Sequence, residues 1–394
     1  MKYDKLISFI SVLNILIFLI LPTSMLIPLK LIMVVVFIFS FITWLLMKNN
    51  FINIKLLIFS TLIVILLLTS YLQNIFTGEF INTGFRFISN SFLILIYVAI
   101  YYHLIEKGIL DINKIRNIVL LSASIYSFTK IIILLFLLKG HITHIKQIIP
   151  EVIYRDYGYF IRINLGNDSV ILFSLLLVLP FANMKAFFLS IIVILFILTT
   201  SFTKYLLLSF IFAIVLLMVF YKKIDVYTLL FIVLVFATFL YFTPIYDIYI
   251  QRFLEFSSYN DKLYQVELFL NKISGSIYIF MFGKGIGSYI HDFIKNQRLP
   301  FIYEVQWLSL FYQLGFLRIL FLALINIFFV YKLYRKGKYY TIITYTLWTF
   351  ASFTNPYLLI SSSFIIYVIC IGVLFNNENL HPRYKRYSKQ LRRF

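Results

Sequence analysis

The stretch Leu26–Met47, "LIPLKLIMVVVFIFSFITWLLM", decides the fold class of this chain. Lys30 is its only charged residue, and an apolar helix of about 20 residues is long enough to cross a membrane. Similar runs recur throughout the 394 residues, of which 62% are hydrophobic and only 13% charged. A soluble fold is excluded, because soluble domains carry about 25% charged residues and lack such repeated runs. The sequence predicts an all-α, polytopic integral membrane helical bundle.

The apolar runs predict about twelve transmembrane helices within a single integral membrane domain, residues 1–394. The two runs that flank Lys185 are also compatible with one re-entrant hairpin. The predicted spans are residues 6–21, 26–47, 54–72, 87–102, 118–138, 168–182, 186–199, 205–221, 226–242, 307–331, 339–353 and 357–375.

The distribution of positive charge predicts the orientation of the chain. The net charge is +20, and cytoplasmic loops of membrane proteins carry an excess of Lys and Arg. With the N-terminus inside, most Lys and Arg fall in inner segments, and the short outer connections contribute only Arg86 and Lys204. The basic tail, residues 376–394, is expected beside anionic lipid rather than on nucleic acid. Both termini are therefore predicted to be cytoplasmic.

This topology leaves two long loops outside the membrane, residues 139–167 and 243–306. Both are rich in Lys, Arg and aromatic residues, although the charge bias of membrane proteins disfavours cations there. An anionic substrate would explain the cations, because guanidinium groups bind phosphate oxygens through paired hydrogen bonds. Lipid headgroups or nearby acids are the alternative partners. The aromatic side chains are compatible with sugar stacking or with an interfacial belt.

An amphipathic helix is expected in the second loop. The segment "DKLYQVELFLNKI" (Asp261–Ile273) repeats apolar residues at helical spacing, namely Leu263, Val266, Leu270 and Ile273. Such a helix would lie on the membrane surface or cap the bundle.

The segment "FGKGIGS" (Phe282–Ser288) resembles a phosphate-binding loop only in its glycines. A nucleotide-binding P-loop needs GxxxxGK followed by Ser or Thr, whereas Lys284 here lies between the first two glycines. The glycines are expected to allow a tight turn or a close approach to a ligand. No cofactor is predicted. No metal is predicted either, since Cys370 is the only cysteine and the pair His141 and His144 has no third ligand at suitable spacing.

Four stretches, taken in order, resemble the bacterial O-antigen polymerase and O-antigen ligase superfamily. They are "RINLGNDSVILFSLLLVLP" (Arg162–Pro180), "TTSFTKYLLLSF" (Thr199–Phe210), "NDKLYQVELFL" followed by "FGKGIGS", and "EVQWLSLFYQLG" (Glu304–Gly315). The resemblance extends over residues 160–375. This chain departs from the family pattern in several places, and Thr203 stands at a family serine. Glu304 stands at the family's histidine, Arg318 at a common glycine, and Lys204 and Lys262 at arginines.

The resemblance implies an enzyme of the bacterial plasma (inner) membrane. It would polymerise oligosaccharide repeats linked to lipid pyrophosphate of the undecaprenyl type into capsular or O-antigen polysaccharide at the outer face. A chain-length regulator is a candidate partner, and no nucleotide is needed outside. Two alternatives stay open: a flippase or transporter of the same lipid-linked units, and ligase-type transfer of finished glycan.

The resemblance and the loop positions together suggest the site residues. Glu304 is expected to remove the proton from the attacking hydroxyl, with Asp261 and His291 as further candidates. The alternative role for Glu304 is to cap the helix beside Trp307. Arg162 is expected to stabilise charge on the pyrophosphate. The full set of cations expected to bind pyrophosphate or glycan is Arg155, Arg162, Lys204, Arg252, Lys262, Arg298 and Arg318.

Overall fold

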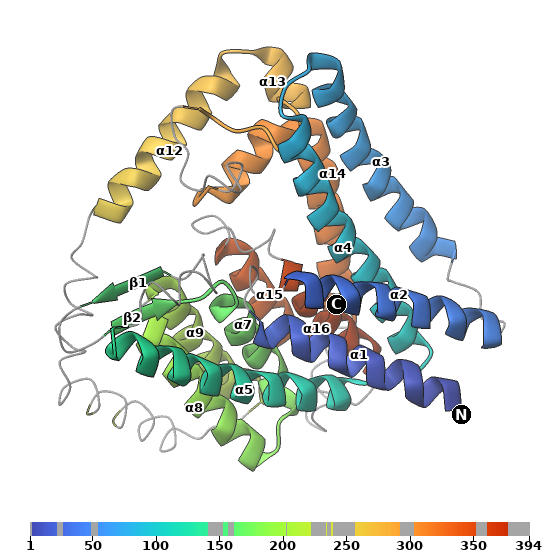
Figure 1. The fold of residues 1–394 in the computed structure, drawn as a ribbon, viewed down its shortest axis with the longest axis vertical. Helices are drawn as coiled ribbons and strands as arrows, with labels where there is room; N and C mark the ends of the chain where they lie inside the picture. Colours follow the sequence, from blue (N-terminus) through green and yellow to red (C-terminus); the bar gives the residue numbers. More distant parts are fainter. Residues whose placement is uncertain are drawn as a thin grey trace, which may run out of the picture.

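The computed structural model describes residues 2–21, 27–48, 54–140, 153–156, 161–201, 203–221, 234, 238, 257–291, 303–351 and 361–376. Helices dominate these residues, as Figure 1 shows. Seven of the described helices are long and apolar enough to cross a membrane. They are α1 (Lys2–Ile20), α2 (Ile27–Lys48), α3 (Ile54–Thr77), α4 (Ile81–Glu106), α5 (Ile112–Leu138), α8 (Met184–Ser201) and α14 (Gln306–Arg335). The predicted all-α membrane bundle is confirmed, while the count of twelve spans stays a prediction.

The larger part of the molecule is a bundle around α7 (Asp168–Val178). Every residue of α7 is buried, as expected for a helix that is hydrophobic on all sides. The helices that contact α7 are α5, α8, α9 (Lys204–Tyr221), α15 (Tyr339–Ala351) and α16 (Phe364–Phe375). Along the chain, α7 is followed by the short η1 turn (Leu179–Phe181) and then by α8. Lys185, between the two predicted runs, therefore lies in the first turn of α8.

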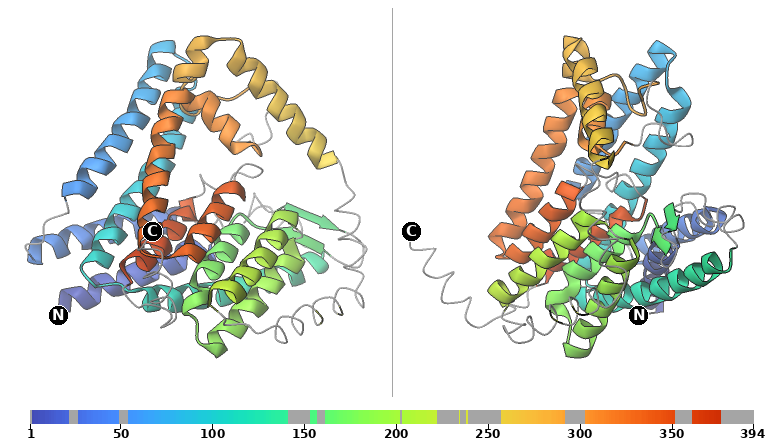
Figure 2. Two further views of the ribbon diagram at one scale, coloured as in Figure 1. Left: turned by 180° about the vertical axis from the view of Figure 1, so that it is seen from behind. Right: turned by 90° about the vertical axis from the view of Figure 1, so that its left-hand side faces the viewer.

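The smaller part lies at one end of the molecule, at the top of Figure 1. It consists of the α3–α4 hairpin, α12 (Ser257–Ser274), α13 (Ile277–Phe282) and the N-terminal part of α14. The two views of Figure 2 show the same separation. From here α4 runs back to contact α16, and α14 runs back to contact α15. These two helices join the smaller part to the bundle.

Within this smaller part, α12 includes the predicted amphipathic segment and buries part of the predicted face, since Ile273 is buried and Val266 packs beside it. Gln265, Phe269 and Ile273 are its buried residues among those described. Leu263 and Leu270, expected on the apolar face, are 47% and 50% exposed. The buried face packs against α14, so contacts with neighbouring helices, rather than hydropathy alone, decide which side of α12 is covered.

A β-hairpin lies within the first predicted outer loop. Strands β1 (Ile153–Asp156) and β2 (Ile161–Asn164) pair antiparallel, and Arg155 lies opposite Arg162 in the register. The sequence analysis did not predict these strands. The residues of β2, "IRIN", alternate apolar and polar types as those of half-buried strands do.

Polar contacts join helix ends at two places in the bundle. On the side of the N-terminus, Asp4 forms an ion pair with Lys48 at 2.9 Å. On the opposite side, the Asn167 side-chain amide donates to the carbonyls of Phe18, Leu19 and Leu21 at the end of α1. The Ser362 hydroxyl donates to Asn167 at 2.9 Å. The N-terminal end of α7 is thereby bound to the C-terminal end of α1.

Candidate functional site

The glycine-rich segment after α13 is held against α14. Gly315 divides the predicted span 307–331 with φ 73° and ψ 170°, so α14 is kinked there. A Cβ atom at Gly315 would overlap the backbone of Gly283, and one at Gly283 would overlap the backbone of Gln313. Only residues without side chains allow two backbones to approach this closely. We call this interlocked region, Gly283–Ser288 with Gly315, the glycine clasp.

The backbone amides of the glycine clasp bind within the protein. The amide of Lys284 donates to the Tyr312 carbonyl at 2.7 Å, and that of Gly285 donates to the Gln313 carbonyl at 3.1 Å. The Gly287 amide donates to Oε1 of Gln313 at 2.8 Å. A phosphate-binding loop directs such amides toward its ligand. The structure therefore agrees with a tight structural turn at these glycines rather than with a nucleotide-binding loop.

The α3–α4 hairpin closes the other side of the glycine clasp. The side-chain amide of Gln73 donates to the Gly283 carbonyl at 2.7 Å, and that of Asn74 donates to the Ile286 carbonyl at 2.5 Å. A Cβ atom at Gly287 would overlap the backbone of Gly84 in α4. The clasp therefore joins α3, α4 and α14 at one point.

The predicted ligand cation Arg318 lies at the kink of α14. Its guanidinium donates to the carbonyl of Phe282 and, at 3.2 Å, to the carbonyl of Leu314. Phe282 is the last residue of α13, where carbonyl groups have no further helical turn to accept from, and Leu314 is next to the kink at Gly315. A structural role at the kink is thus assigned to Arg318, and contact with pyrophosphate stays a prediction.

The predicted base Glu304 lies beside the predicted cation Lys262. The carboxylate Oε2 of Glu304 is 4.0 Å from Nζ of Lys262, and their side chains are 22% and 27% exposed. The backbone amide of Glu304 donates to the side chain of Gln265 at 3.1 Å, which binds this segment to α12. Val305, not Glu304, occupies the N-cap position of α14. An acid and a cation that are far apart in sequence are thus brought together at the start of α14.

An aromatic cluster supports this pair. Phe269 of α12 packs edge-to-face on Tyr303, with ring centroids 4.8 Å apart. The Tyr303 hydroxyl accepts from the Ile290 amide at 2.7 Å and donates to the Ile290 carbonyl at 3.3 Å. Burial raises the pKa of Tyr303 to about 12, so its hydroxyl stays protonated at neutral pH. The residue before Glu304 is therefore fixed to the end of the glycine-rich segment.

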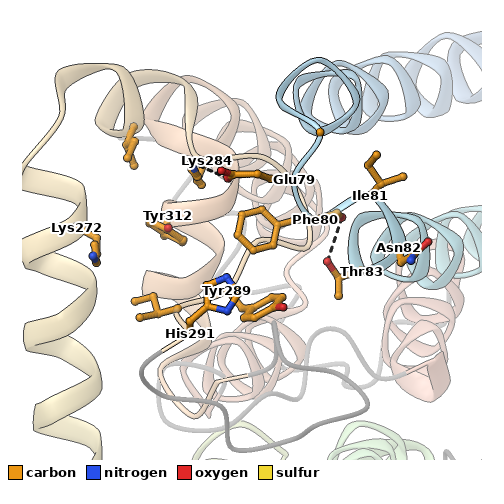
Figure 3. A pocket seen from close by; sticks show the side chains of 13 residues that line it. Glu79, Phe80, Ile81, Asn82, Thr83, Lys272, Lys284, Tyr289, His291 and Tyr312 are labelled. Atoms are coloured by element: carbon orange, nitrogen blue, oxygen red, sulfur yellow. Dashed lines mark hydrogen bonds and ion pairs between the residues drawn. The ribbon is translucent and has the colours of Figure 1, made fainter.

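A cavity of about 920 Å³ lies between the α3–α4 turn and α12. Figure 3 shows its lining, in which the ring of Phe80 lies between the Glu79–Lys284 pair and His291. The ion pair joins Oε2 of Glu79 to Nζ of Lys284 at 2.9 Å. His291, a predicted catalytic candidate, lines this cavity, and Lys272 lines it from α12.

A second group of predicted cations lies at the β-hairpin. Nε of Arg162 donates to the Ser201 carbonyl at the end of α8, at 2.7 Å. Lys204 begins α9 three residues further on and is half-buried. Arg155 is paired opposite Arg162 in the hairpin. The fold therefore brings Arg155, Arg162 and Lys204 to one region. Figure 1 and the left panel of Figure 2 show this hairpin on the same side of the molecule as α12.

Beneath the hairpin, Lys130 and Asp168 form a buried ion pair. Nζ of Lys130 donates to both carboxylate oxygens of Asp168 at 2.9 Å, and the two side chains are 0% and 2% exposed. Asp168 also accepts from the Tyr126 hydroxyl at 2.7 Å and from the Leu165 amide at 3.0 Å. Buried charges persist when they are paired and hydrogen-bonded in this way. The network fixes the turn that leads from β2 into α7.

The remaining predicted site residues are less informative. Asp261 lies on the exposed side of α12. Arg252, Arg298 and the pair His141 and His144 lie outside the described residues. Within the described residues, no group of three or more metal-ligating side chains is found.

Sequence reasoning passed over Glu79 and Phe80, because they lie in a short turn that carries no recognisable motif. Comparison of this chain with family models, curated proteins and solved structures finds no match. The resemblance to the O-antigen polymerase and ligase superfamily thus stays a prediction, and the function is argued below from the site.

Proposed function

We propose that this membrane protein polymerises lipid-pyrophosphate-linked oligosaccharide repeats at the outer face of the bacterial plasma membrane, with both termini in the cytoplasm. The observation that supports the proposal most directly is the proximity of Glu304 and Lys262, whose charged atoms are 4.0 Å apart. A glycosyl transfer from a pyrophosphate donor needs an acid–base group for the hydroxyl and positive charge for the leaving group.

In the proposed reaction, a hydroxyl oxygen of one lipid-linked unit attacks the anomeric carbon of another. The bond from that carbon to the pyrophosphate oxygen breaks, and lipid pyrophosphate leaves with the electron pair. The carboxylate of Glu304 takes the hydroxyl proton, and Lys262 stabilises the negative charge of the leaving group. Because the donor stores the energy, the reaction uses no nucleotide.

The hairpin cations provide further binding capacity for the donor. Nε of Arg162 donates to the Ser201 carbonyl, three residues before Lys204. The two cations therefore lie in one region, where positive charge favours an anionic group. We assign the pyrophosphate of the donor to Lys262 together with Arg162 and Lys204, and the attacking hydroxyl to Glu304.

Transport of the same lipid-linked units is the main alternative. Transporters place ionisable groups at substrate sites midway through the membrane. Among the described residues, the ion pair buried in the bundle is Lys130 with Asp168, and its opposite charges neutralise each other. The side chains suited to glycosyl transfer lie at helix ends instead, which favours an enzyme.

Purified protein in lipid nanodiscs, supplied with lipid-linked repeats extracted from cells that lack this gene, tests the proposal. Wild-type protein is expected to form a polymer ladder on electrophoresis. Glu304→Gln should reduce the rate by about 10²-fold or more, and Lys262→Met should reduce it more than Lys262→Arg.

Glu267→Gln is the matched control, since Glu267 is an exposed acid on α12. An unchanged ladder in Glu304→Gln would remove Glu304 from the mechanism. Movement of lipid-linked repeats across a bilayer without any ladder would show a transporter instead, and transfer of glycan to an acceptor without growth of the ladder would show a ligase.

A further inference from the structure

The cavity at the α3–α4 turn has the dimensions of a ligand site. Its volume of about 920 Å³ lies within the range of about 300–1,000 Å³ typical of small-molecule pockets. Its wall combines aromatic rings with a few polar side chains. The aromatic members are Phe80, Tyr289 and Tyr312, and the polar side chains are Glu79, Asn82, Thr83, Lys272, Lys284 and His291.

Phe80 is held over this cavity in an unusual backbone conformation. Its φ of 56° and ψ of 21° lie in the left-handed region, and it is the only non-glycine residue with positive φ among those described. A bulky residue is a genuine outlier in this region, and such outliers cluster at functional sites. The Phe80 carbonyl accepts from the Gly84 amide at 2.8 Å and from the Thr83 hydroxyl at 3.0 Å. The first turn of α4 thus maintains the conformation.

The ring of Phe80 belongs to an aromatic surface shared with the glycine-rich segment. It packs edge-to-face on Tyr289 with centroids 5.0 Å apart, and it lies 6.0 Å from the imidazole of His291. Tyr289 and His291 are themselves 4.7 Å apart. Figure 3 shows these three rings together on one side of the cavity. Side chains from two distant segments of the chain therefore build one wall.

The charges of the cavity disfavour pyrophosphate as its principal ligand. Lys284 is neutralised by Glu79 at 2.9 Å, which leaves Lys272 on the opposite wall. A sugar ring suits this wall better, because its C–H face packs on aromatic rings whose faces carry partial negative charge. Carboxylate, amide and imidazole groups are also able to accept from or donate to sugar hydroxyls.

The position of the cavity connects it to the proposed acid–base group. Ile290, in the cavity wall, is hydrogen-bonded to Tyr303, the residue before Glu304. Lys272 of the cavity and Lys262 of the Glu304 pair are on the same helix, ten residues apart, which corresponds to about 15 Å along the axis. An oligosaccharide is long enough to reach from one to the other.

We propose that this cavity is a glycan subsite that holds a sugar ring of the acceptor repeat against Phe80 and Tyr289. The inference rests on the proposed polymerase function. It adds an acceptor subsite, made of Glu79, Phe80, Tyr289 and His291, to the side chains that handle the pyrophosphate. Phe80 and Tyr289 would bind the sugar and leave lipid pyrophosphate binding unaffected.

Two probes separate these binding roles. One is the free oligosaccharide repeat, released by mild acid from the extracted lipid-linked units, and the other is undecaprenyl pyrophosphate. Binding of each to nanodisc-embedded protein is measured for the wild type, Phe80→Gly and Tyr289→Ala. Phe80→Gly keeps a residue suited to positive φ while removing the ring. Both variants should bind the oligosaccharide at least about tenfold more weakly and bind undecaprenyl pyrophosphate within about twofold of wild type.

Phe76→Ala is the matched control, since Phe76 is 86% exposed at the end of α3 and does not line the cavity. Polymer laddering in the same samples reports on the proposed function separately. A wild type that forms ladders, with variants that bind the oligosaccharide normally, would place the glycan subsite elsewhere and leave the polymerase function standing. A wild type that binds the oligosaccharide through Phe80 but forms no ladder would keep the subsite and overturn the function. A wild type that neither binds the oligosaccharide nor forms a ladder would overturn both the subsite and the polymerase function.

Discussion

Two helices, α7 and α14, are positioned by different kinds of interaction. Every residue of α7 is buried in the apolar core of the bundle. In α14, by contrast, Leu333 is the only buried residue after the kink, and the N-terminal part before the kink is positioned by the glycine clasp. Burial of apolar surface is roughly proportional to area and tolerates exchanges between apolar residues of similar volume. The close approach of two backbones in the glycine clasp depends instead on single glycine residues.

This difference predicts where substitutions are tolerated. In α7, an exchange such as Leu175→Met conserves volume, and exchanges of this kind cost less than about 1.5 kcal/mol. In the glycine clasp, even one added methyl group has no space, because the neighbouring atoms are backbone. The surface that carries the proposed chemistry is therefore built on the less tolerant of the two regions.

Gly315→Ala should have the largest effect on stability. The new methyl group would overlap the backbone of Gly283, and the φ of 73° is unfavourable for alanine. The backbone of Gly315, with φ 73° and ψ 170°, is in a region essentially restricted to glycine, which costs about 1–3 kcal/mol for other residues, and the overlap adds about 1–3 kcal/mol or more. We expect loss of the folded protein, or a fall in melting temperature of many degrees, measured by thermal denaturation in detergent.

Gly337→Ala is the control for this prediction. Gly337 has a similar φ of 68°, but nothing lies within 4 Å of a Cβ atom at that position. Only the conformational cost of about 1–2 kcal/mol applies there. Equal destabilisation by the two substitutions would show that the close approach in the glycine clasp contributes nothing.

Removing one member of the buried Lys130–Asp168 pair should have the next largest effect. Lys130→Met leaves the Asp168 carboxylate with the Tyr126 hydroxyl and the Leu165 amide but without its cation. Breaking a buried ion pair in this way costs about 3–5 kcal/mol. Thermal denaturation should show that Lys130→Met together with Asp168→Asn is more stable than Lys130→Met alone, because the unpaired charge is gone. A double variant less stable than the single one would show that Asp168 is needed chiefly for its hydrogen bonds.

The same comparison explains what could be predicted from the sequence. Long apolar runs predicted the membrane bundle, because hydropathy determines whether a segment spans the bilayer. The pairing of Glu304 with Lys262 depends on contacts between α12 and the start of α14, which no local pattern encodes. Lys130, a charged residue within an apolar run, is buried against Asp168, as charged groups in membrane helices generally are.

The α3–α4 turn shows the limit of such reasoning. Gly78, Glu79 and Phe80 resemble an ordinary short connection in the sequence, and only the position of the glycine-rich segment beside them makes a cavity. The buried face of α12 illustrates the same limit, since Gln265 is buried while Leu270 is 50% exposed. In both places, contacts between segments far apart in the sequence decide the outcome.

Tyr303→Phe should reduce stability less than Gly315→Ala or Lys130→Met. It tests how the glycine-rich segment is joined to Glu304. The substitution leaves the buried Ile290 amide without its acceptor, at a cost of about 1–3 kcal/mol. Tyr278→Phe is the control, because Tyr278 is 55% exposed on α13 and exposed exchanges usually stay within about 0.5 kcal/mol.

The pH dependence of this effect provides a sharper test. The folded protein holds the pKa of Tyr303 near 12, above the ordinary value of 10.0. A group with a raised pKa contributes its stabilisation fully below the unfolded pKa and loses it as the pH rises toward the folded one. The stability advantage of wild type over Tyr303→Phe should therefore be constant up to about pH 9 and shrink between pH 10 and 12. A constant difference across that range, measured by denaturation at each pH, would mean that the hydroxyl is as accessible to water in the folded state as in the unfolded one. In that case Tyr303 would not hold the cavity wall to the start of α14, and among the contacts described above Glu304 would be positioned by Gln265 and Lys262.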